Sequence, residues 1–345
     1  MYVFPLPVAI WIKALGRAWS QGGRVGFAKG TPGSEEGVGG SSGQWVVTGL
    51  SGSAQRALVR DLHLQATAGS RDAARVAQPK VGLYRPWSAS MDEGWTRWLM
   101  EMYGVAHTSL YNSDVLAGDL IDRYDVIVIA DIRARTIKEG FAKGSVPPRY
   151  AGGIGTEGVR ELDAFVRAGG TLVMLNGASA FAIEEFHLPV EDVTEGLERD
   201  QFSASGAIVE LLVDPSHPVM SGMPERSKVF VGRSPAFTTT DGFEGHVLAK
   251  YPSKGTPLLS GYFLGEEHVQ GYAAALDVKH GDGRVVLLGM KPQWRGQPFG
   301  TFKVLFNAAL YSRAVAAEAP DNGAFWNAPE EPDEERAEGN GRDRR

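Results

Sequence analysis

Apolar side chains recur at helical and strand-like spacings through the first 77 residues. Trp11, Leu15, Ala18 and Trp19 stand close to one helical turn apart, which is typical of an amphipathic helix packed on a domain. Short runs rich in β-branched and aromatic residues predict strands. In order, we expect a helix over 8–20, strands over 24–28 and 45–48 and a helix over 53–66, with a Gly/Ser-rich mobile loop over 30–43. Residues 1–77 are therefore predicted to form a small α/β segment.

From residue 78 onward, apolar runs alternate with helical patterns. Ser90 and Glu93 have the spacing of a capping box, and Trp95 and Trp98 lie on one apolar face of the helix that follows. The run YDVIVIA at 124–130 is almost continuously apolar, as expected of a strand buried on both faces of a parallel sheet. Further strands are predicted over 80–84 and 171–175, and a helix over 156–168. The order β-α-β-α-β predicts an α/β fold with a doubly wound, mostly parallel sheet.

The second half of the chain is richer in strands. We predict strands over 207–213, 228–231, 246–251, 257–263, 272–279 and 284–288, a hairpin turn at HGDGR, and a final helix over 299–314. The end of the chain, PEEPDEERAEGNGRDRR, has charges, Gly and Pro but almost no apolar residue, which favours disorder. The expected organisation is the α/β segment over 1–77, a large α/β domain over 78–315 with an extra strand-rich second half, and a disordered charged tail over 316–345.

The overall composition is that of an ordinary globular protein, with 43% hydrophobic and 22% charged residues. The net charge is −6, so the chain lacks the basic surface that attracts nucleic acids or anionic membranes. It contains no cysteine, which excludes disulfides, cysteine–zinc sites and a cysteine nucleophile. The first residues carry two prolines and no charge before Lys13, so we expect no secretory signal peptide. No stretch is long enough for a membrane-spanning helix.

The predicted strand over 171–175 is followed by a tight corner of small residues, NGASA at 176–180. In several α/β enzymes such a corner holds a nucleophile above the end of the sheet. Ser179 is the candidate, because GASA approaches the G-x-S-x-G motif, but the closing glycine is absent and no clear base follows. We expect Ser179 to cap the next helix instead. The corner is interpreted as an elbow that has lost its nucleophile, with a serine hydrolase as the alternative.

The sequence has no complete zinc motif, and its one cofactor motif lacks the structural context that the motif requires. None of the seven histidines is followed by glutamate at the spacing H-x-E or H-x-x-E, so neither an amidotransferase His-Glu pair nor a zinc site is predicted. Gly153, Gly155 and Gly158 satisfy the dinucleotide fingerprint, but the segment before them, SVPPRYA, is not strand-like. We interpret these glycines as a flexible entry loop and expect no cofactor.

Several longer stretches resemble a known protein family. They include VGLYRPWSASMDEGWTRWLME, YAGGIGTEGVRELDAFVRAGGTLV, DPSHPVMSGMP and GRVVLLGMKPQWRGQPFGTFKVLFNAAL. From about residue 81 to 311 the chain is similar to the C-terminal half of large bacterial carboxypeptidase A-like zinc metallopeptidases. The stretches GRAWSQGGRVGFA and GQWVVTG resemble the segment that joins the peptidase domain to that half. The resemblance implies a class I glutamine amidotransferase-like fold with flavodoxin-like layers. The zinc peptidase domain has no counterpart here, so we expect a truncated or split product of such a gene.

The resemblance also carries an expectation about function. Full-length relatives would be exported metallocarboxypeptidases, and this chain would be their non-catalytic accessory module without the zinc site. On this hypothesis it binds a partner or ligand: the peptidase domain, a peptide or a small carboxylate, but no nucleic acid and no membrane. Two alternatives stay open. One is a serine hydrolase that uses Ser179. The other is a chain that would be classed as a zinc carboxypeptidase only because its longer relatives are.

Polar and aromatic residues follow the predicted strands, where ligands of open α/β sheets bind. An arginine beside a tryptophan suits a carboxylate on an apolar body. Alternatively, the arginines pair with Asp131 and other acids only to hold loops in place. If they bind a ligand, these side chains should converge on one concave pocket. The predicted ligand-binding residues are Arg85, Trp87, Asp131, Asn176, Ser179, Arg233, Gln293 and Arg295, with Lys291 and Trp294 in the same loop as the last two.

Overall fold

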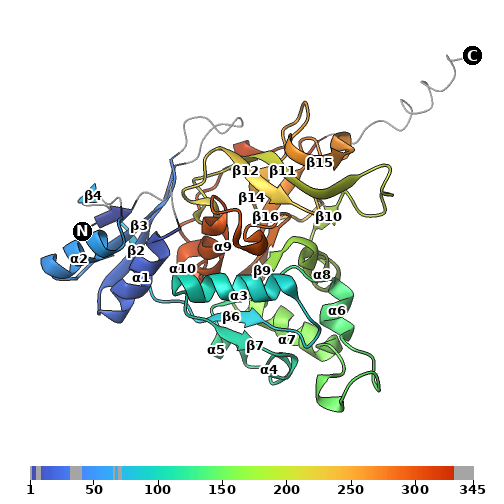
Figure 1. The fold of residues 1–345 in the computed structure, drawn as a ribbon, viewed down its shortest axis with the longest axis horizontal. Coiled ribbons are helices and arrows are strands. Elements are labelled where there is room, and N and C mark those ends of the chain that lie inside the picture. The colour runs from blue at the N-terminus through green and yellow to red at the C-terminus, as the bar shows by residue number, and fades with distance from the viewer. Residues whose placement is uncertain (1, 5–8, 32–40, 65–66, 69–71, 330–345) are drawn as a thin grey trace, which may run out of the picture.

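The central strands are apolar on both faces, so the sheet needs a layer of helices on each side. In β8 (Val126–Ile129), Val126 and Val128 enter one buried cluster, whereas Ile127 and Ile129 enter another. Successive side chains of a strand point to opposite faces, so helices have to cover both faces of this sheet. The computed structural model describes residues 2–4, 9–31, 41–64, 67–68 and 72–329, and it shows helices on both faces (Figure 1).

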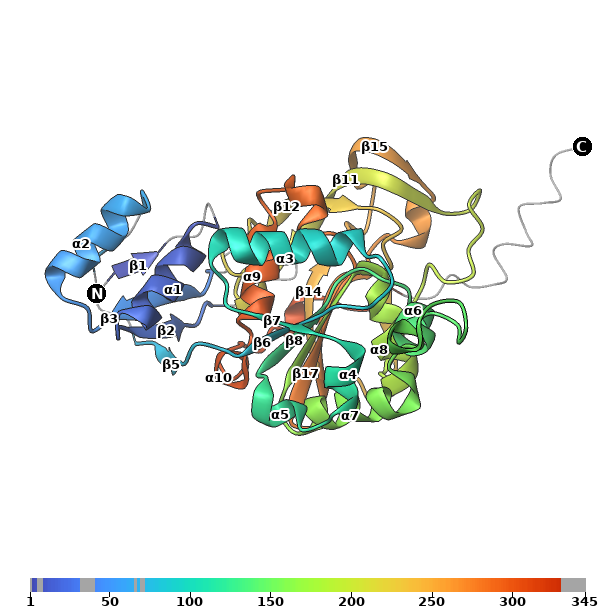
Figure 2. The same cartoon turned by 60° about the horizontal axis from the view of Figure 1, so that its bottom comes forward.

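The parallel part of the sheet has the strand order β17-β9-β8-β6-β7. Besides β8, its strands are β6 (Val81–Tyr84), β7 (Thr108–Leu110), β9 (Thr171–Leu175) and β17 (Gly283–Leu288). Figure 2 shows α3 (Met91–Tyr103) and α9 (Phe302–Ala309) on one side of it. On the other side lie α4 (Asn112–Leu116), α5 (Leu120–Arg123), α6 (Ala134–Glu139), α7 (Gly155–Arg167) and α8 (Ser179–Phe186). The predicted doubly wound α/β fold is confirmed.

The strand-rich second half extends the same sheet with antiparallel strands. From β17 the order continues through β16 (Ala273–His280), β14 (Gly245–Lys250) and β11 (Ser203–Val213) to β12 (Arg226–Val231). β15 (Leu258–Leu264) pairs with β11, and β10 (Val190–Asp192) pairs with β13 (Phe237–Thr239), which also pairs with β16. Because β16 and β17 are joined by the predicted hairpin, the antiparallel part and the parallel part share one continuous ladder.

The N-terminal segment forms a separate five-stranded antiparallel sheet beside this domain. Its strand order is β4 (Thr67–Ala68), β1 (Tyr2–Phe4), β3 (Gln44–Thr48), β2 (Arg24–Ala28) and β5 (Ala74–Val76). Of its helices, α1 (Trp11–Ser20) and α2 (Gly52–Asp61), the first stacks Trp11 on Trp45 with ring centroids 5.8 Å apart. Lys13 lies 5.6 Å from the ring of Tyr103 at the end of α3. The buried residues of this segment join the cluster under α3 and α9, so it packs on the domain through a shared core.

Several predicted boundaries differ from the structure. The helix expected over 299–314 divides into α9 and α10 (Arg313–Ala316), because the chain turns between them and the Tyr311 carbonyl accepts a hydrogen bond from Thr171. The predicted tail begins too early, since Phe325 is buried and the Trp326 indole donates to the Gly271 carbonyl at 2.8 Å. Residues 330–345, and most of the predicted loop over 30–43, lie outside the described residues. In the part of the chain that the structure describes, none of the helices is long and apolar enough to cross a membrane.

Candidate functional site

A cavity of about 500 Å³ opens at the edge of the sheet where the parallel strands end. Asp131 stands two residues beyond β8, Asn176 follows β9 directly, and Lys291 lies three residues beyond β17. Arg233, just after β12, and Met91, at the start of α3, also line it. This is the edge at which open α/β sheets bind their ligands, because the loops that follow the strands gather there.

The corner after β9 is a sharp elbow with Asn176 at its apex. Asn176 has a φ of 53°, in the left-handed region that asparagine tolerates better than most residues. A nucleophile elbow holds its reactive residue on such a sharp, strained turn between strand and helix, so here an asparagine occupies the place of the nucleophile. Ser179 instead is the first residue of α8, and Ala178 is its N-cap. The predicted capping role of Ser179 is therefore wrong, since α8 has no side-chain cap.

Ser179 is also badly placed for catalysis. Its side chain is fully buried in the described structure, and its hydroxyl finds no hydrogen-bond partner among the described residues. A serine nucleophile needs a base within hydrogen-bond reach and access to the substrate. The serine-hydrolase alternative therefore receives no support from the geometry at Ser179.

The floor of the cavity is a network around the carboxylate of Asp131. Lys291 forms an ion pair with Asp131, and its ammonium lies 3.7 Å from Asp92. Asn176 Nδ2 donates to Asp131 Oδ2 at 3.0 Å, and the backbone N–H of Gly177 donates to Oδ1 at 3.1 Å. A Cβ at position 177 would lie only 3.1 Å from the same oxygen, so glycine permits this close approach. The carboxylate is thus held by charge and by two N–H donors.

Asp92 adds a second carboxylate beside Lys291. It belongs to the first turn of α3, and its side chain is only 12% exposed. Burial raises the pKa of Asp92, and the nearby charge of Asp131 raises it further, while Lys291 acts in the opposite direction. Lys291 therefore lies between two carboxylates and already has its partners.

The mouth of the cavity has a different character. Arg133 and Arg233 line it and are exposed, and neither guanidinium forms an ion pair or hydrogen bond within the described residues. Arg233 has a φ of 52°, an uncommon conformation for a residue with a side chain. Phe230 and Trp294 stack with ring centroids 5.1 Å apart and form an apolar wall. The cavity thus combines two unpaired cations with an aromatic surface.

Ser179 is buried and does not line the cavity, and the other predicted site residues fall into three groups. Asp131, Asn176 and Arg233 line the cavity together. Gln293 and Arg295 lie beside it: Gln293 is buried and donates to Thr96, whereas the guanidinium of Arg295 lies 4.8 Å from the Trp294 ring.

The third group lies elsewhere. Trp87 stacks with Tyr111 at 4.8 Å and meets Tyr150 edge-on, and Arg85 lies 5.5 Å from the Tyr111 ring. These contacts place Arg85 and Trp87 beside β7, outside the residues that line the cavity. The expectation that all the arginines converge on one pocket is therefore wrong for Arg85 and for Arg295, neither of which lines the cavity. The alternative, in which the arginines pair with Asp131, does not describe the structure either, because Lys291 is the cation that pairs with Asp131.

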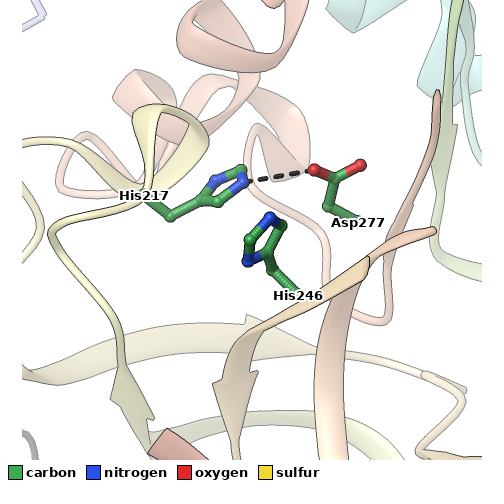
Figure 3. A group of neighbouring side chains, drawn as sticks. All are labelled: His217, His246 and Asp277. Carbon is green, nitrogen blue, oxygen red and sulfur yellow. Dashed lines mark hydrogen bonds and ion pairs between the residues drawn. The ribbon is translucent and has the colours of Figure 1, made fainter. Parts of the chain in front are cut away.

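A second polar cluster lies deep in the sheet and was not predicted. His217 follows β11, His246 is on β14 and Asp277 is on β16, and one potential ligand atom from each lies within 4.8 Å of the others (Figure 3). His217 Nε2 lies 3.2 Å from Asp277 Oδ2, and the Tyr311 hydroxyl donates to the same oxygen at 2.7 Å.

The hydrogen bonds of this second cluster argue against a metal centre. A metal-bound imidazole usually donates its second N–H to an oxygen. Here the N–H of Val219 donates to His217 Nδ1 at 3.2 Å, so the proton of the neutral ring is on Nε2, the atom that faces Asp277. Arg284 also lies 3.5 Å from that carboxylate. These residues fit a closed hydrogen-bonded cluster better than a metal site.

Sequence reasoning missed Asp92, Arg133 and Phe230 in the cavity, and the whole His217 cluster. In the sequence, Asp92 is simply part of a helix start, and Phe230 is part of a strand. The aspartate inside the apolar run AAALDV was a usable signal, because a lone charge in a buried strand needs a partner. No comparable signal marked Arg133, which reaches the cavity only through the turn after β8.

Comparisons with known proteins give remote likenesses of fold. No protein family and no curated protein matches the chain. A cytoplasmic protein from Salmonella typhimurium is 17% identical with a TM-score of 0.41, over 68% of this chain and 98% of that chain. A ThuA-like protein from Bacteroides uniformis is 14% identical with a TM-score of 0.40, over 75% of this chain and 99% of that one. A protein described as a GMP synthase component, from Thermoplasma acidophilum, is 10% identical with a TM-score of 0.40, over 70% and 96%. None of these likenesses bears on activity.

Proposed function

We propose that this chain is a non-catalytic, amidotransferase-like module that binds a small carboxylate at the carboxyl edge of its sheet. The observation that carries the proposal is the pair of arginines at the cavity mouth, Arg133 and Arg233, which have no ion-pair partner among the described residues. The acidic side chains inside the cavity cannot serve them, because Asp131 is already paired with Lys291.

The chemistry of the cavity favours a carboxylate over other ligands. A guanidinium presents a planar set of N–H donors that matches the two oxygens of a carboxylate. The stacked rings of Phe230 and Trp294 offer an apolar wall to the rest of the ligand. Catalysis is not proposed, because the elbow carries Asn176, whose Nδ2 donates to Asp131 and whose Oδ1 accepts from Ser234 at 2.5 Å.

The resemblance to carboxypeptidase A-like metallopeptidases supports a more specific role. In this proposal the chain is an accessory module of such a protein, and the bound carboxylate belongs to a peptide or to an amino acid. The peptidase domain would be the partner, and it alone would hold the catalytic zinc. This role rests only on the resemblance of the stretches quoted above, from about residue 81 to 311, since no family model and no curated protein matches the chain.

The test uses N-acetylphenylalanine and its carboxamide as probes, with binding measured by calorimetry. We expect the carboxylate to bind and the amide to bind at least about tenfold more weakly, because a charged hydrogen bond contributes about 1.5–3 kcal/mol. Arg233→Gln should weaken carboxylate binding by a similar factor. Arg135→Gln is the matched control, since Arg135 is exposed on α6 and pairs with Glu139 away from the cavity. Equal binding of acid and amide, or binding of neither, contradicts the proposal.

A further inference from the structure

The cavity lined by Asp131, Arg133 and Arg233 is called the carboxylate cavity below. A second hollow lies next to it, along α3. Its volume is about 630 Å³, and Met91, Trp95, Trp98, Arg295 and Gly296 line it. Met91 also lines the carboxylate cavity, so the two hollows are adjacent and share a wall. We call the second hollow the α3 groove.

The α3 groove is unusually apolar for an exposed surface. Trp98 and Met91 are each 42% exposed, and Trp95 meets Trp98 edge-on with ring centroids 5.3 Å apart. Gly296 has a φ of 66°, and a Cβ there would lie 3.1 Å from the ring of Trp98. The backbone of the loop after β17 therefore lies directly against the tryptophan rings. Exposed aromatic surfaces of this kind mark binding sites in soluble proteins.

The residues between the two hollows connect a cationic site to an aromatic one. Trp294 faces the carboxylate cavity, and the charged ends of Lys291 and Arg295 each lie 4.8 Å from its ring. Arg295 lines the groove on the other side. A ligand that enters the cavity with its charged end can therefore extend past Met91 and Trp294 onto the rings of Trp95 and Trp98.

We propose that the α3 groove holds the apolar body of the ligand whose carboxylate binds in the neighbouring cavity. The ligand is then a carboxylate with an extended apolar body, and neither a short acid nor a neutral hydrocarbon fulfils both halves of the site. This inference rests on the proposed function of the cavity. Whereas the proposed function specifies only a carboxylate, this inference specifies that the ligand also has a long apolar body.

The experiment compares butanoate with octanoate, with affinities taken from NMR titrations of the tryptophan indole N–H signals. A fully buried methylene group strengthens binding about fourfold. Because the groove is open on one side, we expect octanoate to bind about tenfold or more tightly than butanoate. Octanol, which lacks the carboxylate, should bind more weakly than octanoate.

Variants separate the two halves of the site. Trp98→Ala should bind butanoate like the wild type and lose most of the gain with octanoate. Met102→Ala is the matched control, because Met102 is 51% exposed on the same helix and does not line the groove. Gly296→Ala tests the groove independently, by placing a methyl group against the Trp98 ring. Thermal unfolding of each variant shows whether the fold is retained.

The outcomes distinguish this inference from the function on which it rests. If neither acid binds, the carboxylate site itself is wrong, and the groove loses its ligand with it. If both acids bind equally, or if Trp98→Ala keeps the full gain with octanoate, only the groove is wrong. A further arm compares octanoate with N-acetyl-Ala-Ala-Phe. Tighter binding of either compound supports the groove. The compound with the higher affinity shows whether the ligand is a free acid or the carboxyl terminus of a peptide.

Discussion

Two polar clusters lie in the same sheet, one at its carboxyl edge and the other deep inside it, and they differ in what their charges face. At the carboxyl edge, Asn176 and Asp131 stand beside an open cavity. Deep inside the sheet, the His217 cluster includes Tyr311, whose carbonyl accepts a hydrogen bond from Thr171 at the start of β9. Both clusters hold a carboxylate by several hydrogen bonds. Only the first has unpaired cations at its rim, among the residues that the structure describes.

The difference teaches that buried charge alone does not mark a binding site. Asp277 is fully buried, and His217, Tyr311 and Arg284 surround its Oδ2. Such a cluster contributes to the uniqueness of the core, although Asp277 Oδ1 has no hydrogen-bond partner among the described residues. The side chain of Asp131 is 20% exposed, and its network ends at a cavity, where a ligand can add further partners. Accessibility and unpaired donors separate the two roles.

The largest loss of stability is expected when the His217 cluster is disrupted. Asp277→Ala removes the carboxylate and leaves its two buried partners, His217 and Tyr311, without it, so we expect a loss of about 3–5 kcal/mol in the free energy of unfolding. The matched change Asp131→Ala should lose only about 1–3 kcal/mol, because water can reach the partners of Asp131. Denaturant unfolding of both variants measures the difference. Equal losses would show that the two clusters do not differ as described.

The second prediction concerns the cation inside the cavity. Lys291→Met leaves Asp131 and Asp92 without their shared partner, so we expect a loss of about 2 kcal/mol in the free energy of unfolding. In the Asp131→Asn background the same change should cost less, since one of the two charges is already gone. A double-mutant cycle measures this coupling. A coupling of zero would mean that the ion pair contributes nothing to stability.

The third prediction concerns acid pH at the closed cluster. Burial lowers the pKa of His246, and the charge of Arg284 lowers it further, against the opposite effect of Asp277 and Asp321. The pKa of His246 is then lower in the folded chain than in the unfolded chain. Neutral His246 therefore makes its full contribution to the free energy of unfolding above the unfolded-state pKa of about 6.5. That contribution is lost as the pH falls below about 6.5 toward the lower pKa of His246 in the folded chain.

The melting temperature should therefore fall between pH 7.5 and pH 5, and His246→Gln should flatten that fall. A matched change at an exposed histidine, His63→Gln, should leave the profile unchanged. An identical slope in wild type and His246→Gln would refute the assignment.

The smallest effect is expected at the elbow. Ser179→Ala removes a buried hydroxyl that has no partner among the described residues, so the free energy of unfolding should change by no more than about 1 kcal/mol. Carboxylate binding should be unchanged as well. Loss of a measurable hydrolase activity in this variant would restore Ser179 as a nucleophile.

The elements of the fold were largely predictable, whereas the site was predictable only in part. The strand Thr171–Leu175 and the capping of α3 by Ser90 were predicted correctly from local patterns. The rule that ligands bind beyond the strand ends correctly brought Asp131, Asn176 and Arg233 to one cavity. It also included Arg85, which the structure places against Tyr111, because the rule does not say in which direction a loop side chain points.

The sequence by itself determined the layered α/β fold, because apolar runs and helical periodicities act through local backbone preference and burial, which a linear pattern records. It also excluded cysteine chemistry. Only the tertiary structure decided that Asn176 is the apex of the elbow, that Lys291 is the partner of Asp131, and that His217 meets Asp277 in the core. These contacts join residues 60 to 160 positions apart. Their pairing depends on strand order and on the direction of each loop, and neither is encoded in the spacing of any single segment.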